Sequence, residues 1–229
     1  MEGEWSNGRA RRLTERGVDH RNSHSLDAIQ NGDCYFTSGF YESAISHHIV
    51  TTAGCSDTVW FIRDQLVPTY QLYGQFLDVE FIPWGRTVRN LDGSLTCQFG
   101  NPDCWANRVH RCALHFLGDD QDAKMRYMGC EFPDMTNRPA FNQGSLLCGL
   151  MTGVNLYALD RCANTFFGEP LDKINEVAAT VPMAIINFVP AVYINDRPDS
   201  NEWVNIFLNF REVICRMLAE DPSTGVTNC

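Results

Sequence analysis

A cysteine between a predicted strand and a predicted helix is the feature that most constrains this chain. An apolar, β-branched run predicts a core strand over residues 48–54, and an amphipathic run predicts a helix over residues 57–72 that Pro68 kinks or ends early. Cys55 lies at the start of that helix. Unpaired N–H groups and the helix dipole stabilise a thiolate at this position, so Cys55 is a candidate nucleophile.

Further strands place this junction in a mixed α/β fold. Residues 77–82 alternate apolar and polar side chains, and residues 83–85 (Pro-Trp-Gly) end the run. Strand, helix and strand at this spacing predict a right-handed crossover and a parallel pair. Residues 189–194, entered through Pro190, predict another strand, and residues 201–219 predict an amphipathic C-terminal helix.

The middle of the chain is dense in cysteine and has helical patterning. Helices are predicted over residues 103–116, 121–129 and 145–160, with a short one over 171–179, separated by glycine and proline. We interpret residues 97–165 as a helical insertion held by disulfides. Ten cysteines in the chain favour an oxidising compartment, and their spacing with histidine does not fit common zinc sites, so we expect no metal and no cofactor.

Charge and hydropathy exclude several classes of protein. The formal net charge of −10 argues against a nucleic-acid-binding surface, although the segment around Arg9–Arg21 is locally basic. We interpret residues 1–32 as a flexible arm, solvated or attracted to anionic surfaces. No run reaches the apolar length of a membrane-spanning helix. No signal peptide is visible either, and we expect that one has been removed from a secreted or lysosomal protein.

The most specific pattern lies at the start of the cysteine-dense region. It resembles the C-Q-H-G-x2-E-C-x2-N-x4-C motif of the gamma-interferon-inducible lysosomal thiol reductase (GILT) family, with Phe99 in place of His and Asp103 in place of Glu. The matching residues are Cys97, Gln98, Gly100, Cys104, Asn107 and Cys112. The resemblance covers about residues 48–229 and is closest in character to divergent insect members.

The resemblance implies a fold and a chemistry. The fold would be thioredoxin-like (βαβ…βα) over residues 33–229, with the helical insertion within it. In the family, the first cysteine of C-x-x-C attacks a substrate disulfide and the second resolves the mixed disulfide. Cys55 matches the first, but Thr58 stands at the second in Cys55-Ser56-Asp57-Thr58. Pro190 is the candidate cis-proline beside the active cysteine.

Thr58 decides the predicted function. A hydroxyl group cannot displace sulfur from a mixed disulfide, so the reductase centre lacks its second nucleophile. We therefore predict a secreted, non-catalytic protein that binds a protein partner of unknown identity. The alternative is a monothiol reductase in which Cys55 forms a mixed disulfide that an external thiol such as glutathione resolves, so the sequence leaves open whether the chain is an enzyme.

The cysteine count leaves two thiols without an assigned partner. Eight cysteines from Cys97 onward can form four bridges, and we predict Cys215–Cys229, which closes a short loop after the last helix. The pairing among the other six stays open; these include Cys130, Cys148 and Cys162. Cys34 either crosslinks to Cys55 and covers the site, or both stay free. The pair His47-His48 is expected on the surface.

Overall fold

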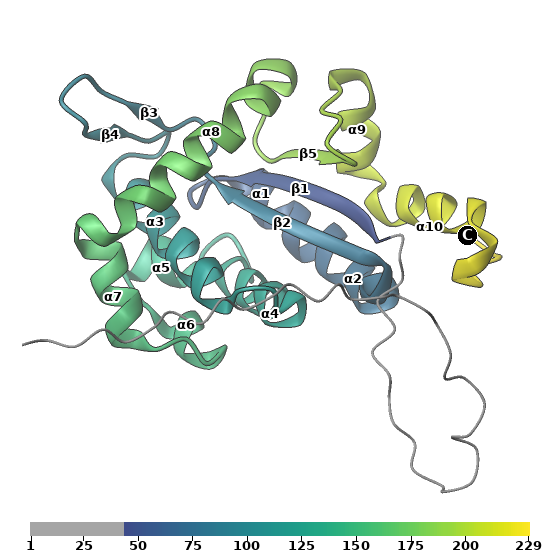
Figure 1. The fold of residues 1–229 in the computed structure, drawn as a ribbon, viewed down its shortest axis with the longest axis horizontal. Helices are drawn as coiled ribbons and strands as arrows, with labels where there is room; N and C mark the ends of the chain where they lie inside the picture. Colours follow the sequence, from purple (N-terminus) through teal and green to yellow (C-terminus); the bar gives the residue numbers. More distant parts are fainter. Residues whose placement is uncertain (1–43) are drawn as a thin grey trace, which may run out of the picture. The chain divides into compact units, whose positions relative to one another are not determined.

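The computed structural model of the protein describes residues 44–229 (Figure 1). The arm expected over residues 1–32 and the side chain of Cys34 lie outside the described residues. The described part is a mixed α/β structure that is mostly helical. Its elements in order are β1 (Ile45–Thr51), α1 (Ser56–Trp60), the π-helix η1 (Phe61–Leu66), α2 (Val67–Tyr73), η2 (Gly74–Phe76), β2 (Leu77–Pro83), β3 (Val88–Arg89), β4 (Leu95–Thr96), α3 (Asn101–Leu117), α4 (Gln121–Glu131), α5 (Pro139–Gln143), α6 (Leu147–Met151), α7 (Leu156–Asn164), η3 (Phe166–Gly168), α8 (Glu169–Ile186), β5 (Ala191–Ile194), α9 (Ser200–Leu208), α10 (Phe210–Glu220) and η4 (Pro222–Thr224).

The central sheet has the strand order β2-β1-β5. Strand β1 pairs in parallel with β2, which confirms the parallel pair predicted from the strand–helix–strand spacing. Strand β5 runs antiparallel to β1, with Val50 opposite Ala191. The first strand lies earlier than predicted: it ends at Thr51, because the chain already turns at residues 52–54 to start α1.

Helices cover both faces of this sheet, and side-chain alternation decides which residue meets which helix. Ile49 and Val79 enter the larger core with α1, η1, α3 and α10. Val50 and Ile82 face the other way, into a smaller core with Ala179 of α8. In Figure 1, α8 lies on the side of the sheet opposite α1 and α2. Both faces of β1 are therefore buried, as its apolar sequence requires.

The first helix runs further than predicted. Helical structure continues past Pro68 to Tyr73, with a π-helical segment at Phe61–Leu66 just before the proline. Proline has no N–H to donate to the preceding turn, and wider π-type bonds such as Val67 N–H to Ile62 O accommodate that gap. The predicted kink or early end at Pro68 is thus a local change of helix type.

Other predicted boundaries also need correction. The helix expected over residues 145–160 is two helices, α6 and α7, because Gly153 adopts a positive φ of 85° between them. The C-terminal helix is likewise broken at Asn209 into α9 and α10. The short helix expected over residues 171–179 extends from Glu169 to Ile186, because its buried face continues to the end of α8.

Disulfides connect the helices of the middle region. Cys112 of α3 is bonded to Cys162 of α7, and Cys130 of α4 to Cys148 of α6. Two shorter bridges close local loops, Cys97–Cys104 and the predicted pair Cys215–Cys229. The bridge Cys112–Cys162 spans a sequence separation of 50, and Cys130–Cys148 spans 18. Each closes a loop and so reduces the entropy of the unfolded chain.

A buried ion pair anchors α8 to α3. Asp172 is fully buried and accepts from the guanidinium groups of Arg108 and Arg111, with Arg111 Nη2 at 2.6 Å. Burial lowers the pKa of Arg111 to about 10, while the Asp172 charge acts in the opposite direction. Arg111 also lies over the Trp84 ring, at 5.3 Å from its centroid. Each charge here has a partner, which is the condition for burying it.

The two adjacent histidines differ from the surface pair that we expected. His47 is fully buried and packs edge-on against Phe210, and burial lowers its pKa to about 4. His48 lies on the opposite face of β1, where Nδ1 is 3.0 Å from Glu80 and Nε2 is 2.8 Å from Asp196. The hydrogen bond with Glu80 raises the pKa of His48 above its ordinary value.

The His48 cluster predicts a specific pH dependence. A raised pKa means that protonated His48 stabilises the fold below about pH 6.5, and that this contribution disappears as the pH rises through the folded-state pKa. The same hydrogen bond lowers the pKa of Glu80, so the contribution of Glu80 to stability persists to more acidic pH. We expect His48→Gln to lower the free energy of unfolding by about 1 kcal/mol at about pH 5.5, and by less at about pH 8.5.

Urea unfolding of both proteins at the two pH values measures this difference. The double variant His48→Gln/Glu80→Gln is the control. Once His48 is absent, removing Glu80 as well should reduce the pH dependence of the free energy of unfolding no further. An equal cost of His48→Gln at both pH values would contradict the interpretation.

Candidate functional site

Cys55 lies where α1 begins and next to a segment from the far end of the chain. It is the N-cap residue of α1, and its side chain is 6% exposed. Its thiol Sγ–H donates to the backbone oxygen of Val189 at 3.3 Å. The Val189–Pro190 peptide bond is cis, and Pro190 O accepts from Trp203 Nε1 at 2.9 Å. The fold thus brings Cys55 and Pro190 together at one site.

Among the described residues, Cys55 is a free thiol. The crosslink to Cys34 that we considered involves a residue outside the described part of the chain and stays a prediction. The expected stabilisation of the Cys55 thiolate needs correction. Burial raises the pKa of Cys55 above its ordinary value, and the N–H groups of Thr58 and Asp57 offset this only in part. The N–H groups at the start of the helix favour the thiolate, but the removal of water from the buried side chain has the larger effect and raises the pKa.

Thr58 lies one helical turn from Cys55 and is fully buried. Within residues 44–229, its hydroxyl has no hydrogen-bond partner of normal geometry, although it lies close enough to Cys55 to favour the thiolate slightly. A hydroxyl group beside a thiol can polarise it, but it cannot take part in thiol–disulfide exchange. The site therefore holds one sulfur atom where C-x-x-C holds two.

Two residues of α3 hold the turn that leads into Cys55. Asp103 is fully buried; Oδ1 accepts from Thr52 Oγ1 at 2.8 Å and from Gly54 N at 2.9 Å. Asn107 accepts from Ala53 N at 2.9 Å and donates to Thr52 Oγ1 at 2.9 Å. Every residue from 52 to 54 is thus bonded to one helix. We name these contacts the α3 clamp: Thr52, Ala53 and Gly54 held by Asp103 and Asn107.

The α3 clamp gives a physical role to two positions of the motif at residues 97–112, those of Asp103 and Asn107. Asp103 stands where the motif that the sequence resembles has glutamate, and Thr52 belongs to the turn before Cys55. The shorter carboxylate and the threonine hydroxyl bond each other directly, at 2.8 and 2.9 Å. The aspartate that departs from the motif therefore bonds directly to the turn before Cys55.

Phe99 covers the same turn from outside. A Cβ atom added at Gly54 would lie 2.4 Å from two ring atoms of Phe99, so the ring packs directly on the glycine. Phe99 is 40% exposed and forms part of the surface beside the nearly buried Cys55. The aromatic side chain at this motif position therefore packs on the turn that leads into Cys55.

Arg138 is a member of the site that sequence reasoning missed. Its Nη1 donates to Ala53 O at 3.1 Å, and its guanidinium lies 4.4 Å from the centroid of Phe141. Burial lowers the pKa of Arg138, while the negative charges of a Cys55 thiolate and of Asp103 act in the opposite direction. No local pattern marks this arginine, because it reaches the site only through the folding of the helical insertion.

The other motif residues support the site without lining it. Gly100 is the N-cap residue of α3 and has a φ of 78°, a conformation that glycine adopts without strain. Cys97 and Cys104 bridge the residues on either side of it, and Cys112 ties α3 to α7. Gln98 is exposed. The motif therefore builds the start of α3, from which Asp103 and Asn107 reach the turn.

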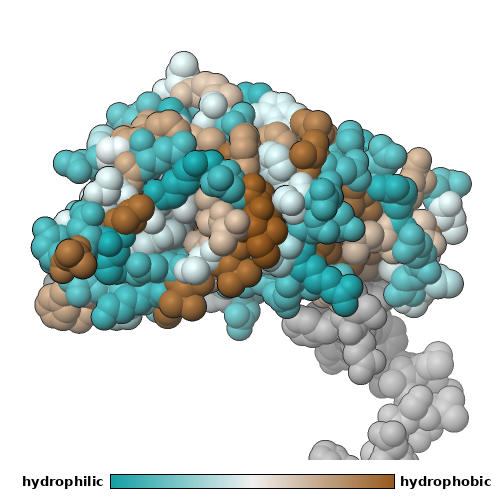
Figure 2. All heavy atoms as spheres, turned by 90° about the horizontal axis from the view of Figure 1, so that it is seen from above, coloured by the Kyte–Doolittle hydropathy of each residue, from teal (hydrophilic) through white to brown (hydrophobic). Residues whose placement is uncertain are grey.

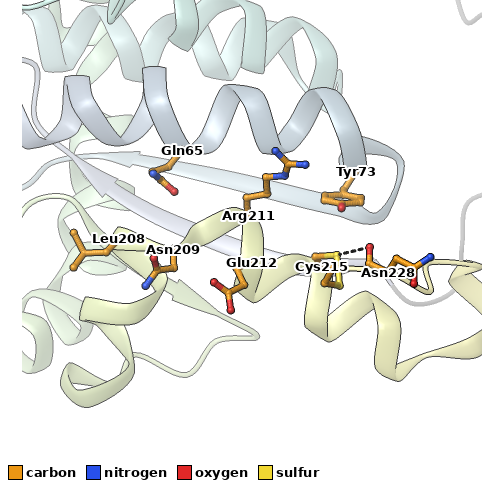
Figure 3. A pocket seen from close by; sticks show the side chains of 9 residues that line it. Gln65, Tyr73, Leu208, Asn209, Arg211, Glu212, Cys215 and Asn228 are labelled. Carbon is orange, nitrogen blue, oxygen red and sulfur yellow. Dashed lines mark hydrogen bonds between the residues drawn. A yellow bond between two sulfur atoms is a disulfide. The ribbon is translucent and has the colours of Figure 1, made fainter.

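The lining of one hollow in the surface does not include Cys55. This hollow, of about 490 Å³, lies between η1 and α10, lined among others by Gln65, Arg211 and the Cys215–Cys229 disulfide (Figure 3). Within the described part of the chain, no three His, Cys, Asp or Glu side chains are grouped to hold a metal ion. Over residues 44–229 there is also no helix with the length and apolarity that crossing a membrane demands.

The packing of Phe99 on Gly54 predicts a coupling between them. We expect Gly54→Ala to lower the free energy of unfolding by about 1–3 kcal/mol, because the new methyl group displaces the ring. In a Phe99→Ala background, the same change should cost much less, and a double-mutant cycle by chemical denaturation measures the difference. Equal costs in both backgrounds would show that the ring does not restrict this turn.

Comparison with known proteins identifies relatives of this chain. Residues 47–148 match the family model described as gamma interferon inducible lysosomal thiol reductase (GILT). A GILT-like protein of Anopheles gambiae is 23% identical over 203 residues, covering 82% of this chain and 83% of the relative. The gamma-interferon-inducible lysosomal thiol reductase of Mus musculus is 25% identical over 180 residues, covering 73% and 70%.

Proposed function

Since the chain belongs to the GILT family, we propose that it keeps the thioredoxin-like scaffold of a thiol reductase but acts as a non-catalytic, partner-binding protein. The observation that carries the proposal is the pair Cys55 and Thr58: one buried thiol and one buried hydroxyl at the positions of C-x-x-C. Without a second sulfur, a mixed disulfide at Cys55 has no internal resolving group.

The proposed fold rests on the arrangement around Cys55. The parallel pair β1–β2 joined by α1 and α2, the antiparallel β5 and the cis bond before Pro190 beside Cys55 are all features expected of a thioredoxin-like core. The helical region with its bridges Cys112–Cys162 and Cys130–Cys148 corresponds to the proposed insertion.

Three features support a binding rather than a catalytic role. The pKa of Cys55 is raised by burial, so less of it is thiolate at a given pH. Its S–H and the Val189 carbonyl are bonded to each other, which occupies backbone that would otherwise face an extended substrate. Phe99 packs over the adjoining turn.

We further propose that the protein works outside the cytosol, in a secreted or lysosomal setting. Four disulfides support this, since such bridges persist in oxidising compartments. The mouse relative is itself named as lysosomal. The partner would be another protein, held by a surface that these bridges keep rigid.

A disulfide-reduction assay tests the proposal. We expect the wild-type protein and Cys55→Ala to reduce insulin disulfides at the same background rate, with or without glutathione, at acidic and at neutral pH. A glutathione-dependent rate that Cys55→Ala abolishes would overturn the proposal and support the monothiol alternative.

A further inference from the structure

Three titratable side chains lie together in the interior of the protein, away from the hydrophilic surface that covers much of the face in Figure 2. His110 of α3 and Tyr127 and Glu131 of α4 have exposed fractions of 1%, 0% and 1%. His110 Nε2 lies 3.5 Å from Glu131 Oε2, and the rings of His110 and Tyr127 pack edge to face. We call these three residues the buried cluster.

The buried cluster is incompletely paired. Both ring nitrogens of His110, the Tyr127 hydroxyl and Glu131 Oε1 have no hydrogen-bond partner of normal geometry within residues 44–229. Burying polar groups in this way costs free energy, and apolar residues of similar volume would avoid that cost. Stability therefore does not account for the carboxylate of Glu131, and the hydrogen bond that it does form indicates its role.

Glu131 connects α4 to α5. Its Oε2 accepts a hydrogen bond from Ala140 N at 2.9 Å. Ala140 is the second residue of α5, and N–H groups in the first turn of a helix have no acceptor within that helix. A carboxylate is a stronger acceptor for such a group than a neutral oxygen. Glu131 thus fixes the point at which α5 begins.

Arg138 is attached to the same end of α5, where it is the N-cap residue. Asn142 Oδ1 accepts from Arg138 N at 3.0 Å and from Arg138 Nε at 3.2 Å, and the guanidinium lies over the Phe141 ring. The side chain is therefore fixed to α5, and its Nη1 reaches Ala53 O in the turn before Cys55. The position of the first turn of α5 consequently decides where this cation lies.

We propose that Glu131 is a positioning residue: by fixing the start of α5 it holds Arg138 against the turn, so that the helical insertion sets the reactivity of the Cys55 thiol. The charged groups at the turn and the thiol are Asp57 of α1, Asp103 of α3 and Arg138. Asp57 disfavours the thiolate, whereas Arg138 is the cation of the three and favours it. In return, the negative charge of the thiolate favours the protonated form of Arg138.

The pH dependence of Cys55 alkylation by iodoacetamide tests the proposal in the folded full chain. A Cys34→Ser background leaves Cys55 as the reacting thiol, because the other eight cysteines form disulfides. The midpoint of the profile reports the acidity of the thiol, and the plateau at high pH reports its accessibility. The result does not depend on the proposed function, since alkylation needs neither a second thiol nor a partner.

We expect Arg138→Met to move the midpoint to higher pH and to slow alkylation at about pH 7 at least threefold, because the cation is lost while most of the side-chain volume remains. Glu131→Met should move the midpoint in the same direction and slow alkylation at least about twofold, because Arg138 is no longer held in place.

Three further variants separate positioning from a general loosening of the fold. Glu131→Gln keeps an oxygen that can accept from Ala140 N and should retain the wild-type midpoint. Glu131→Met combined with Arg138→Met should shift the midpoint no further than Arg138→Met alone, because Glu131 acts through Arg138. Arg126→Met removes an exposed cation of α4 and should leave the midpoint unchanged.

A loosened fold would raise the plateau without moving the midpoint. An unchanged midpoint in Arg138→Met or in Glu131→Met, an equal shift in Glu131→Gln or in Arg126→Met, or additive shifts in the double variant would each overturn the proposal. If circular dichroism shows that Glu131→Met does not fold, Ala140→Pro takes its place, because proline is tolerated in the first turn of a helix but has no N–H to donate. An unchanged midpoint in Ala140→Pro would overturn the proposal equally.

Discussion

Thr58→Cys is expected to give this protein the disulfide-reductase activity that we propose the wild type lacks. Position 58 lies one helical turn after Cys55, at the spacing of C-x-x-C, and its side chain is already buried against the thiol site. A sulfur there supplies the nucleophile that releases substrate from a mixed disulfide. We expect insulin reduction at least about tenfold above the wild-type rate, because a slow intermolecular step becomes intramolecular.

Two variants control this experiment. Thr58→Ser keeps a hydroxyl at the same place and should stay at the background rate, and Cys55→Ala in the Thr58→Cys protein should return the rate to background. Mass spectrometry of the Thr58→Cys protein shows whether Cys55 forms a disulfide with the introduced cysteine. If that disulfide forms and the protein still fails to turn over, the missing sulfur is not what limits the site.

Asp103→Asn is expected to be the most damaging single change at the site. Asp103 accepts hydrogen bonds from Thr52, Gly54 and the backbone of Phe99 while fully buried. An amide in its place directs N–H groups at these donors and leaves several of them unpaired. We expect the free energy of unfolding to fall by about 2–4 kcal/mol, and Cys55 to react faster with an alkylating reagent as the turn loosens.

Asp92→Asn is the matched control for this change. Asp92 also accepts two hydrogen bonds, from the backbone and hydroxyl of Ser94, but it is exposed. Its replacement should leave both the stability and the Cys55 alkylation rate close to the wild-type values, because surface substitutions rarely change either. An Asp103→Asn protein as stable as the wild type, with an unchanged alkylation rate, would show that the α3 clamp does not hold the turn.

Much of the scaffold could be predicted because the relevant signals are local. The alternation of residues 77–82 corresponds to β2, and a cysteine between a strand and a helix corresponds to the N-cap of α1. The ends of the helices could be predicted less closely, because they depend on tertiary packing. The helical structure that passes Pro68 needs a π-helical segment, and the length of α8 depends on a buried face that only the folded sheet provides.

The electrostatics of the site could not be predicted from the position of Cys55 in the chain. A helix N-terminus lowers the pKa of a thiol, but removal of water raises it, and the balance depends on how deeply the fold buries the side chain. The same holds for His47 and His48: adjacent residues of a strand face opposite sides, and only the packing of α10 against β1 buries the first of them.

The sequence by itself determined the chemistry that is available: one cysteine and one threonine where two thiols would be needed, and the family motif at residues 97–112. The tertiary structure alone decided what surrounds that chemistry. Asp103, Asn107 and Arg138 lie 49 to 85 residues from the turn that they bind, and Val189 lies 134 residues from Cys55. The first three contacts arise from the packing of α3 on β2 and of α5 on α3, and the fourth from the pairing of β5 with β1. No local pattern encodes these long-range contacts.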